Sequence, residues 1–457
     1  MINAVFFVFF LLLPATSFAT ENNPKPWRLS DGSGPLQISG GQLLRYESLN
    51  GQYRAGRSGS DQVLLARSNV RAELTFNAVD LGIEVLDARQ ALADRGTPLS
   101  SGLVNTAAVQ QLYTTLRLGD VLQAESKVDV RIGRQTLDLG SRRLVARSDF
   151  STAPTSFTGA VVTLNTAGGN RTRIFHMAPV QNNPQDIESL LSNTTEVDRL
   201  NHAIRVTGIY TEYLYLSKRF ITDLFLIRVS EKHSERHPNT HRTLNSAGFR
   251  LFRTAVTQQI DFQLESVLQW GHSHANAAPA EQGLRHRAGM VHAELGYSFS
   301  GTWRTRLQLQ LDYATGDDNP GDKENNRYDT LYGDRRFDFG PTGIYGPFSR
   351  PNLISLGYRV SATPFSNTRL MLSHRAYQLE SARDAWAGSG LRDSRGKAGR
   401  DLGQQLEVRL QWDVLPGNLM LEGGAAWLNT ASFARRASAG TAPSESQYAY
   451  LQSILSF

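Results

Sequence analysis

Apolar and polar residues alternate strictly along the segment from Trp303 to Tyr313. Three leucines lie between the two terminal aromatic residues, and the intervening positions carry Arg304, Arg306, Gln308, Gln310 and Asp312. A period of two predicts a β-strand with two unlike faces. In a soluble sandwich the leucine face packs inward, whereas in an outer-membrane barrel it faces lipid and the charged face lines a wet lumen. The rest of the chain decides between these two architectures.

The same alternation recurs in about eighteen strand-like segments between residues 36 and 457, most of them long enough to cross a bilayer when tilted. Short and long connections alternate between these segments. The long ones surround residues 48–62, 92–107, 141–156, 181–202, 232–243, 272–285, 317–350, 381–400 and 431–444. A soluble sandwich has no reason to sort its connections by length. We therefore predict an all-β protein, a transmembrane antiparallel β-barrel of about 18 strands with short periplasmic turns and long extracellular loops.

The N-terminal segment predicts export. Val5 to Leu13 is an apolar run too short to span a membrane as a helix, and the small-residue site Ser17-Phe18-Ala19 follows it. We interpret residues 1–19 as a signal peptide, residues 20–35 as a periplasmic leader and residues 36–457 as the barrel domain in the cell outer membrane. The chain contains no cysteine, which fits a large exported barrel that does not depend on disulfides.

The last predicted strand ends on an aromatic residue. Phe457 shares a face with Leu455 and Leu451 in an alternating segment. This ending resembles the recognition signal of bacterial outer-membrane barrels. The expected partners are therefore outer-membrane lipid and, through Phe457, the barrel-assembly machinery. A buried edge strand that happens to end in phenylalanine is the alternative interpretation.

If the apolar side chains face lipid, their neighbours face the lumen, because each charge on the lipid face costs about 2–4 kcal/mol near the midplane. This parity predicts an inner face with more arginines than acids. The predicted pore-lining, anion-binding arginines are Arg67, Arg71, Arg131, Arg205, Arg228, Arg250, Arg304, Arg306, Arg359, Arg369, Arg375 and Arg409. The predicted pore-lining acids are Glu73, Asp129, Asp261, Glu265, Asp312 and Glu407.

Two interpretations of this lining stay open. Only six of the 48 basic residues are lysines, and arginine binds carboxylates and phosphates in a bidentate manner that lysine does not. Arginine-rich walls would attract a polyanion, while interspersed acids would keep its binding weak enough for release. Alternatively, the same charges form a ladder of ion pairs that keeps the lumen wet and ordered.

Several short motifs resemble those of the alginate-export family of outer-membrane barrels. They are Asp87-Ala88-Arg89, Arg131-Ile132-Gly133-Arg134-Gln135 with Arg142-Arg143-Leu144-Val145, and Asp312-Tyr313-Ala314-Thr315-Gly316-Asp317-Asp318-Asn319-Pro320 with Leu331-Tyr332 and Asn352-Leu353. The resemblance implies an eighteen-stranded barrel through which an anionic polysaccharide diffuses along an arginine-lined pore. The chain departs from the family pattern at Gly333-Asp334-Arg335-Arg336 and in the short turn from Val414 to Asn418, where the family's alginate secretin has a substantial periplasmic turn.

Other constellations are weaker. Asp317, Asp318 and Asp322 could bind calcium through oxygen ligands, although a solvated external loop is the simpler interpretation. A histidine group could assemble a metal site, but its members lie in loops and lack zincin spacing: His233, His237, His241, His272 and His274. No nucleophile elbow, P-loop or dinucleotide fingerprint is present. We therefore predict no enzyme, no cofactor, no metal and no nucleic-acid partner.

The sequence thus supports three functional hypotheses. The first is a passive outer-membrane channel that exports an anionic, alginate-like polysaccharide. The second is a general or anion-selective porin that takes up small solutes. The third is an outer-membrane enzyme or adhesin that acts through its external loops.

Overall fold

The structure is a computed structural model, and it describes residues 34–119, 126–148, 150–217, 220–232, 241–274 and 283–457. The predicted signal peptide, most of the predicted leader and two of the loop histidines, His233 and His237, lie outside the described residues.

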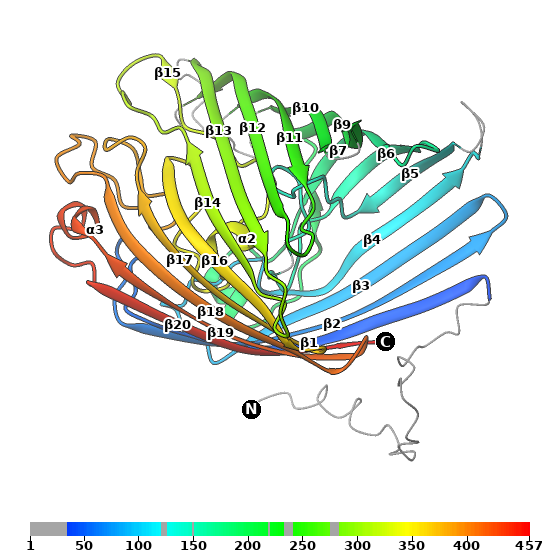
Figure 1. The fold of residues 1–457 in the computed structure, drawn as a ribbon, viewed down its shortest axis with the longest axis horizontal. Coiled ribbons are helices and arrows are strands. Elements are labelled where there is room, and N and C mark those ends of the chain that lie inside the picture. Colours follow the sequence, from blue (N-terminus) through cyan, green and yellow to red (C-terminus); the bar gives the residue numbers. More distant parts are fainter. Residues whose placement is uncertain (1–33, 120–125, 149, 218–219, 233–240, 275–282) are drawn as a thin grey trace.

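The described chain forms a closed antiparallel β-barrel (Figure 1). Each long strand pairs with its neighbour in sequence, and β1 pairs with both β2 and β20, which closes the wall. Among the described residues, 18 strands form this wall, because β8 and β15 are two-residue strands outside it. The predicted fold is confirmed. The strands are β1 (Leu36–Asn50), β2 (Ser60–Phe76), β3 (Val79–Ala91), β4 (Asn105–Arg117), β5 (Lys127–Gln135), β6 (Phe157–Asn165), β7 (Arg171–Gln181), β8 (Arg199–Leu200), β9 (Ile204–Ser217), β10 (Phe220–Glu231), β11 (Thr243–Arg253), β12 (Ile260–His274), β13 (Gly283–Ser298), β14 (Arg306–Ala314), β15 (Glu324–Asn325), β16 (Leu353–Phe365), β17 (Thr368–Gln378), β18 (Asp401–Leu415), β19 (Leu419–Thr430) and β20 (Glu445–Ser456).

The three helices are short and lie in the long connections: α1 (Ile187–Leu191), α2 (Arg336–Phe339) and α3 (Ser432–Ala437). Among the residues that the structure describes, no helix is long and apolar enough to cross a membrane. The connections alternate in length as predicted. Strands β2 and β3 are joined by residues 77–78 and β18 and β19 by residues 416–418, whereas β14 and β16 are joined by residues 315–352.

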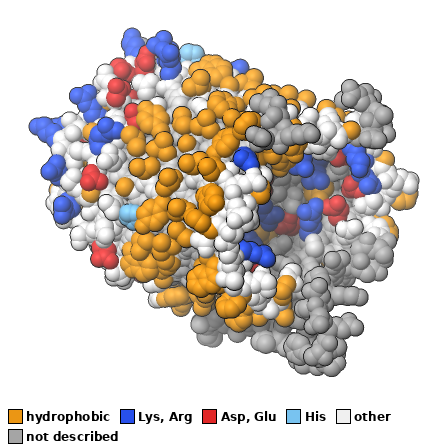
Figure 2. Space-filling model, viewed as in Figure 1, with side chains coloured by type: hydrophobic (Ala, Val, Ile, Leu, Met, Phe, Trp, Pro, Cys, Tyr) orange, Lys and Arg blue, Asp and Glu red, His pale blue; other side chains and the backbone are white. Residues whose placement is uncertain are grey.

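The wall has an apolar outer face and a polar inner face. In β14, Leu309 on the outer face is 53% exposed, whereas Gln310 beside it is 1% exposed and points inward. Figure 2 shows hydrophobic side chains as a broad band on the outer surface, with charged side chains gathered in the hollow beside it. The strand begins at Arg306, three residues later than the alternation predicts, because residues 301–304 form a turn in which Arg304 donates its backbone N–H to Gly301 O (3.1 Å).

Two long loops fold into the barrel instead of standing above it. We call residues 136–156 the first inner loop and residues 315–352 the second inner loop. Their backbones pair with each other: Ala146 N donates to Tyr332 O (3.0 Å), and Tyr332 N donates to Leu144 O (2.9 Å). Helix α2 belongs to the second inner loop and lies within the barrel outline in Figure 1.

The inner loops give the barrel an apolar core. The first inner loop places Leu139 and Val145 against the inner wall of β9 and β10, where Val206, Tyr210 and Ile227 are buried. The second inner loop packs Tyr345 and other aromatic residues against β20 and the loop after β17 in a second cluster that includes Tyr53, Phe348, Tyr377, Trp386 and Tyr448. Where a loop covers the inner wall, both faces of a strand are therefore apolar.

Candidate functional site in the barrel lumen

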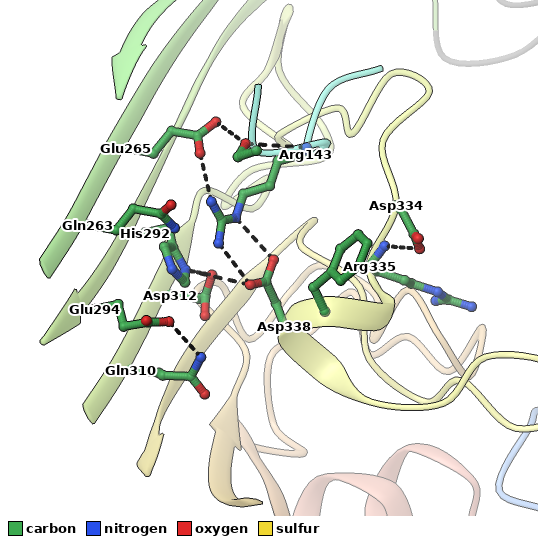
Figure 3. Close-up of polar contacts among 12 residues, drawn as sticks. Arg143, Gln263, Glu265, His292, Glu294, Gln310, Asp312, Asp334, Arg335 and Asp338 are labelled. Carbon is green, nitrogen blue, oxygen red and sulfur yellow. Dashed lines mark hydrogen bonds and ion pairs between the residues drawn. The ribbon is translucent and has the colours of Figure 1, made fainter. Parts of the chain in front are cut away.

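A buried carboxylate joins the two inner loops. Asp338 on α2 accepts two hydrogen bonds from Arg143 of the first inner loop (3.0 and 2.9 Å) and one from Arg350 of its own loop. The third nitrogen of Arg143 donates to Glu265 on β12 (2.7 Å), which anchors the pair to the wall (Figure 3). All four side chains are buried. Since a buried charge is tolerated only when it is paired, these contacts fix both loops in the lumen.

The cluster continues onto β13, β14 and β17. Asp312 accepts from Arg375 (2.5 Å) and hydrogen-bonds His292 Nδ1 (2.8 Å). Three arginines and three carboxylates thus balance around Asp338, so the group carries no net charge when His292 is neutral. Burial, reinforced by the neighbouring Arg143 guanidinium, lowers the pKa of Arg350 to about 10, and that guanidinium therefore stays charged at neutral pH.

Ligand atoms of His292, Asp312 and Asp338 lie within 4.8 Å of one another, the one such group in the described part of the chain. Both carboxylates already accept hydrogen bonds from guanidinium groups. The surrounding arginines would repel a cation, so the arrangement fits an ion-pair lock better than a metal centre.

A second set of contacts holds α2 to β18 and β20. Arg336 donates to Glu407 on β18 (2.7 Å) and to the hydroxyl of Tyr450 on β20 (2.8 Å). Further along the loop, Ile344 N donates to Glu47 on β1 (2.9 Å), and Glu47 also pairs with Arg45 (2.7 Å). Arg359 on β16 and Arg375 on β17 donate to the backbone carbonyls of Phe337 and Asp338, so the second inner loop is held along the adjoining strands β16, β17 and β18 and also to β1.

A polar cavity of about 440 Å³ lies on the inner wall of β3 to β7. Four arginines and three aspartates line it, with threonine and asparagine between them: Arg117, Arg131, Arg171, Arg173, Asp80, Asp129 and Asp138. Arg131 stacks over the ring of Tyr113 (4.1 Å) and donates to Thr115 (2.9 Å). The cavity is therefore mainly polar and open to water, with more arginines than aspartates among its charged residues.

Comparison with known proteins decides the family. A sequence model of the alginate export family matches residues 36–440. The chain belongs to the alginate export family. No curated protein matches it by sequence.

Solved structures share the fold of this alginate export family member. Pseudomonas aeruginosa OccK9 (OpdG) is 13% identical with a TM-score of 0.60, covering 92% of this chain and 98% of that one. Acinetobacter baumannii OccAB2 is 10% identical with a TM-score of 0.60 and the same coverage. Pseudomonas aeruginosa OccK2 (OpdF), solved in complex with glucuronate, is 12% identical with a TM-score of 0.55, again covering 92% and 98%. Family and fold are those of outer-membrane channels, and the chain is located in the cell outer membrane.

The structure places most predicted lumen residues on the inner face by strand alternation. These are Arg67, Arg71, Arg131, Arg250, Arg306, Arg359, Arg369, Arg375 and Arg409, together with Glu73, Asp129, Asp261, Glu265, Asp312 and Glu407. Many are already paired with one another: Arg71 with Glu73 (2.5 Å), Arg306 with Asp261 and Glu294, and Arg375 with Asp312. In the described part of the chain, by contrast, Arg131, Arg359 and Arg409 form no ion pair with a carboxylate.

Three predicted positions are wrong. Arg205 and Arg228 lie on the outer face, where Arg205 alternates in step with exposed Ile209 and Arg228 with exposed Leu226. Parity fails there because the first inner loop makes the inner faces of β9 and β10 apolar as well. Arg304 lies in the turn before β14, with φ of 45°, instead of within the strand.

Sequence periodicity missed the inner-loop residues that organise the lumen, Arg143, Arg336, Asp338 and Arg350, because loops have no repeat. The sequence signal that could have found these residues is the set of alginate-export motifs. Arg143 belongs to it, and so does Gly316, where an added Cβ would lie 2.0 Å from Asn352 Oδ1. That same oxygen accepts from Ser381 N (2.6 Å) and ties the second inner loop to the loop after β17.

Proposed function

We propose that this protein is a passive channel for an anionic, alginate-like polysaccharide, which diffuses out through an arginine-lined lumen. The observation that carries the proposal is the charged cavity on the inner wall of β3 to β7, where four arginines face three aspartates. A uronate chain presents one carboxylate per sugar, and the guanidinium group matches a carboxylate with two parallel hydrogen bonds. Membership of the alginate export family supports this substrate class.

The arginines without an acidic partner are the best candidates for substrate contact. Arg131 in the cavity, and Arg359 and Arg409 on β16 and β18, keep donors available that Arg306 and Arg375 have already committed to neighbouring acids. Exposed arginine–carboxylate pairs are worth only about 0.2–1 kcal/mol each. Several such contacts in series would hold a polyanion in the lumen without trapping it.

Uptake of small anions is the second candidate, and the inner loops favour it. Both loops enter the lumen and are fixed there by buried ion pairs, which narrows the passage available to a polymer. The structure of OccK2 (OpdF) with glucuronate supports a single uronate as an alternative cargo for this fold. Both candidate functions require the same arginine-lined wall, and they differ in the size of the solute that passes through the channel.

Planar-bilayer recordings of the purified barrel test the proposal. We expect anion-selective conductance and concentration-dependent block by alginate. Arg131→Gln should weaken both, while Arg228→Gln, which removes the same charge from the outer face, serves as the matched control. Cation selectivity, or equal effects of both variants, would contradict the proposal. A closed, non-conducting barrel would instead favour an enzyme or adhesin that acts through its loops.

Liposome-swelling assays separate the two cargo sizes. If polymer passes, swelling should continue with uronate oligosaccharides of increasing length. If only glucuronate and similar small acids pass, swelling should be absent for oligosaccharides longer than one or two sugars. The uptake porin then becomes the better description.

A further inference from the structure

Helix α2 buries one of its two phenylalanines, Phe339, and exposes the other. It buries its two charged residues, Arg336 and Asp338, and leaves Phe337 between them 39% exposed. The buried charges are explained by their partners, Glu407 on β18 for Arg336 and Arg143 of the first inner loop for Asp338. The exposed phenyl ring is not explained by packing, since an apolar side chain gains by leaving water.

Phe337 faces the lumen and not the lipid. Its carbonyl accepts a hydrogen bond from the inner-face side chain of Arg359 (2.6 Å), and its two neighbours are bonded to β18 and to the first inner loop. The ring is therefore an exposed apolar surface inside the barrel, between two buried charged side chains.

Arg142 of the first inner loop is held against this ring. Its guanidinium carbon lies 4.5 Å from the ring centre. The residue has φ of 68°, a left-handed conformation that costs energy for any residue but glycine. Two backbone bonds impose it: Arg142 N donates to Leu139 O (2.8 Å), and Asp334 N donates to Arg142 O (2.9 Å). Both inner loops thus cooperate to place the guanidinium group beside the phenyl ring.

We propose that Phe337 and Arg142 form a contact site for one carboxylated sugar ring. The C–H face of the pyranose would pack on the phenyl ring, and its carboxylate would accept hydrogen bonds from Arg142, which also pairs with Asp138 (3.2 Å). An aromatic ring alone binds neutral sugars, and an arginine alone binds any anion. The two together select an acidic saccharide. This inference rests on the proposed function and adds the element that distinguishes a uronate from other anions.

The test compares three blockers of the ion current through the full-length barrel in planar bilayers: an alginate oligosaccharide, a neutral malto-oligosaccharide of equal length, and citrate, which is an anion without a sugar ring. Phe337→Leu keeps an apolar side chain of similar volume but removes the aromatic face. It should shorten the blocked time for the alginate oligosaccharide by about two- to tenfold and leave citrate block unchanged. Phe337→Tyr should retain wild-type blocked times. The control is Phe365→Leu, because Phe365 is 69% exposed at the end of β16.

Arg142→Gln provides the second arm. It should reduce block by the alginate oligosaccharide toward the level of the neutral one, with little change for the latter. If the wild type is blocked by alginate but Phe337→Leu leaves the blocked time unchanged, or shortens citrate block equally, the contact site is refuted and the proposed function stands. If no uronate blocks the wild type, the proposed function fails and this site fails with it. Heat-modifiable gel migration verifies that each variant is folded.

Discussion

Asp338→Asn should release the second inner loop from the lumen while leaving the barrel wall intact. The substitution removes the one negative charge that Arg143 and Arg350 share, and their side chains are only 6% and 2% exposed. Removing one partner of a buried ion pair costs about 3–5 kcal/mol, because the remaining charge stays buried without a partner or water to stabilise it. Among the described residues, the Asp338 carboxylate accepts hydrogen bonds from the two inner loops, and its contact with the wall is His292 Nδ1 at 4.0 Å, so most of this cost falls on docking of the loop.

A cost of that size shifts the docking equilibrium by about 10²- to 10⁴-fold toward the undocked loop. We expect larger and noisier single-channel conductance, together with faster tryptic cleavage after Arg335 and Arg336, which are half-buried and buried in the wild type. Asp318→Asn is the control, since it removes the same charge from an exposed position of the same loop.

A second variant distinguishes loss of docking of the second inner loop from general misfolding of the protein. Adding Arg350→Met to Asp338→Asn removes one of the stranded positive charges and should recover part of the docking. Wild-type conductance and wild-type protease resistance in Asp338→Asn would refute the reasoning, because they would mean that the ion-pair cluster does not hold the loop.

Three further outcomes are expected. Gly316→Ala should lower the protease resistance of the external loops, because the new Cβ would meet Asn352 Oδ1 at 2.0 Å and break its bond to Ser381; an unchanged digestion pattern would contradict this. Arg205→Gln should leave anion selectivity, measured from reversal potentials, at the wild-type value, since the side chain lies on the outer face; a loss of selectivity would contradict that assignment. Conductance should be flat from pH 7 to 9: burial lowers the pKa of Arg350 to about 10, so its contribution to docking changes only as the pH rises through that value, and a step below pH 9 would count against this account.

The fold was predictable because lipid imposes a simple rule on every strand that it touches. Leu309 faces lipid and Gln310 does not, so period and orientation follow directly from the sequence of β14. Loop length then distinguishes a membrane barrel from a soluble sandwich. The same rule fails at Arg205 and Arg228, where the first inner loop replaces water with leucine and valine side chains. The alternation of a strand depends on the environment of both of its faces. The sequence of the strand alone does not show which loop covers its inner face.

The candidate site was predictable only in part. Asp312, Glu265 and Arg375 lie in alternating strands and were found by parity, whereas Arg143, Asp338 and Arg350 lie in loops that have no period. Their association depends on tertiary contacts between segments about two hundred residues apart. Predicted arginines also differed in availability, since a strand pattern places a side chain on the inner face but does not show whether a neighbouring acid already occupies it.

The balanced cluster around Asp338 has a consequence for how the protein is assembled. Its six charges come from β12, β14, β17 and both inner loops, so it completes only after these strands stand side by side and the wall has closed. Until then the loops lack this anchor. We therefore expect full docking of the inner loops to follow closure of the wall. Cells that produce a variant unable to complete it should insert the barrel normally yet become sensitive to bulky antibiotics and detergents that the outer membrane ordinarily excludes.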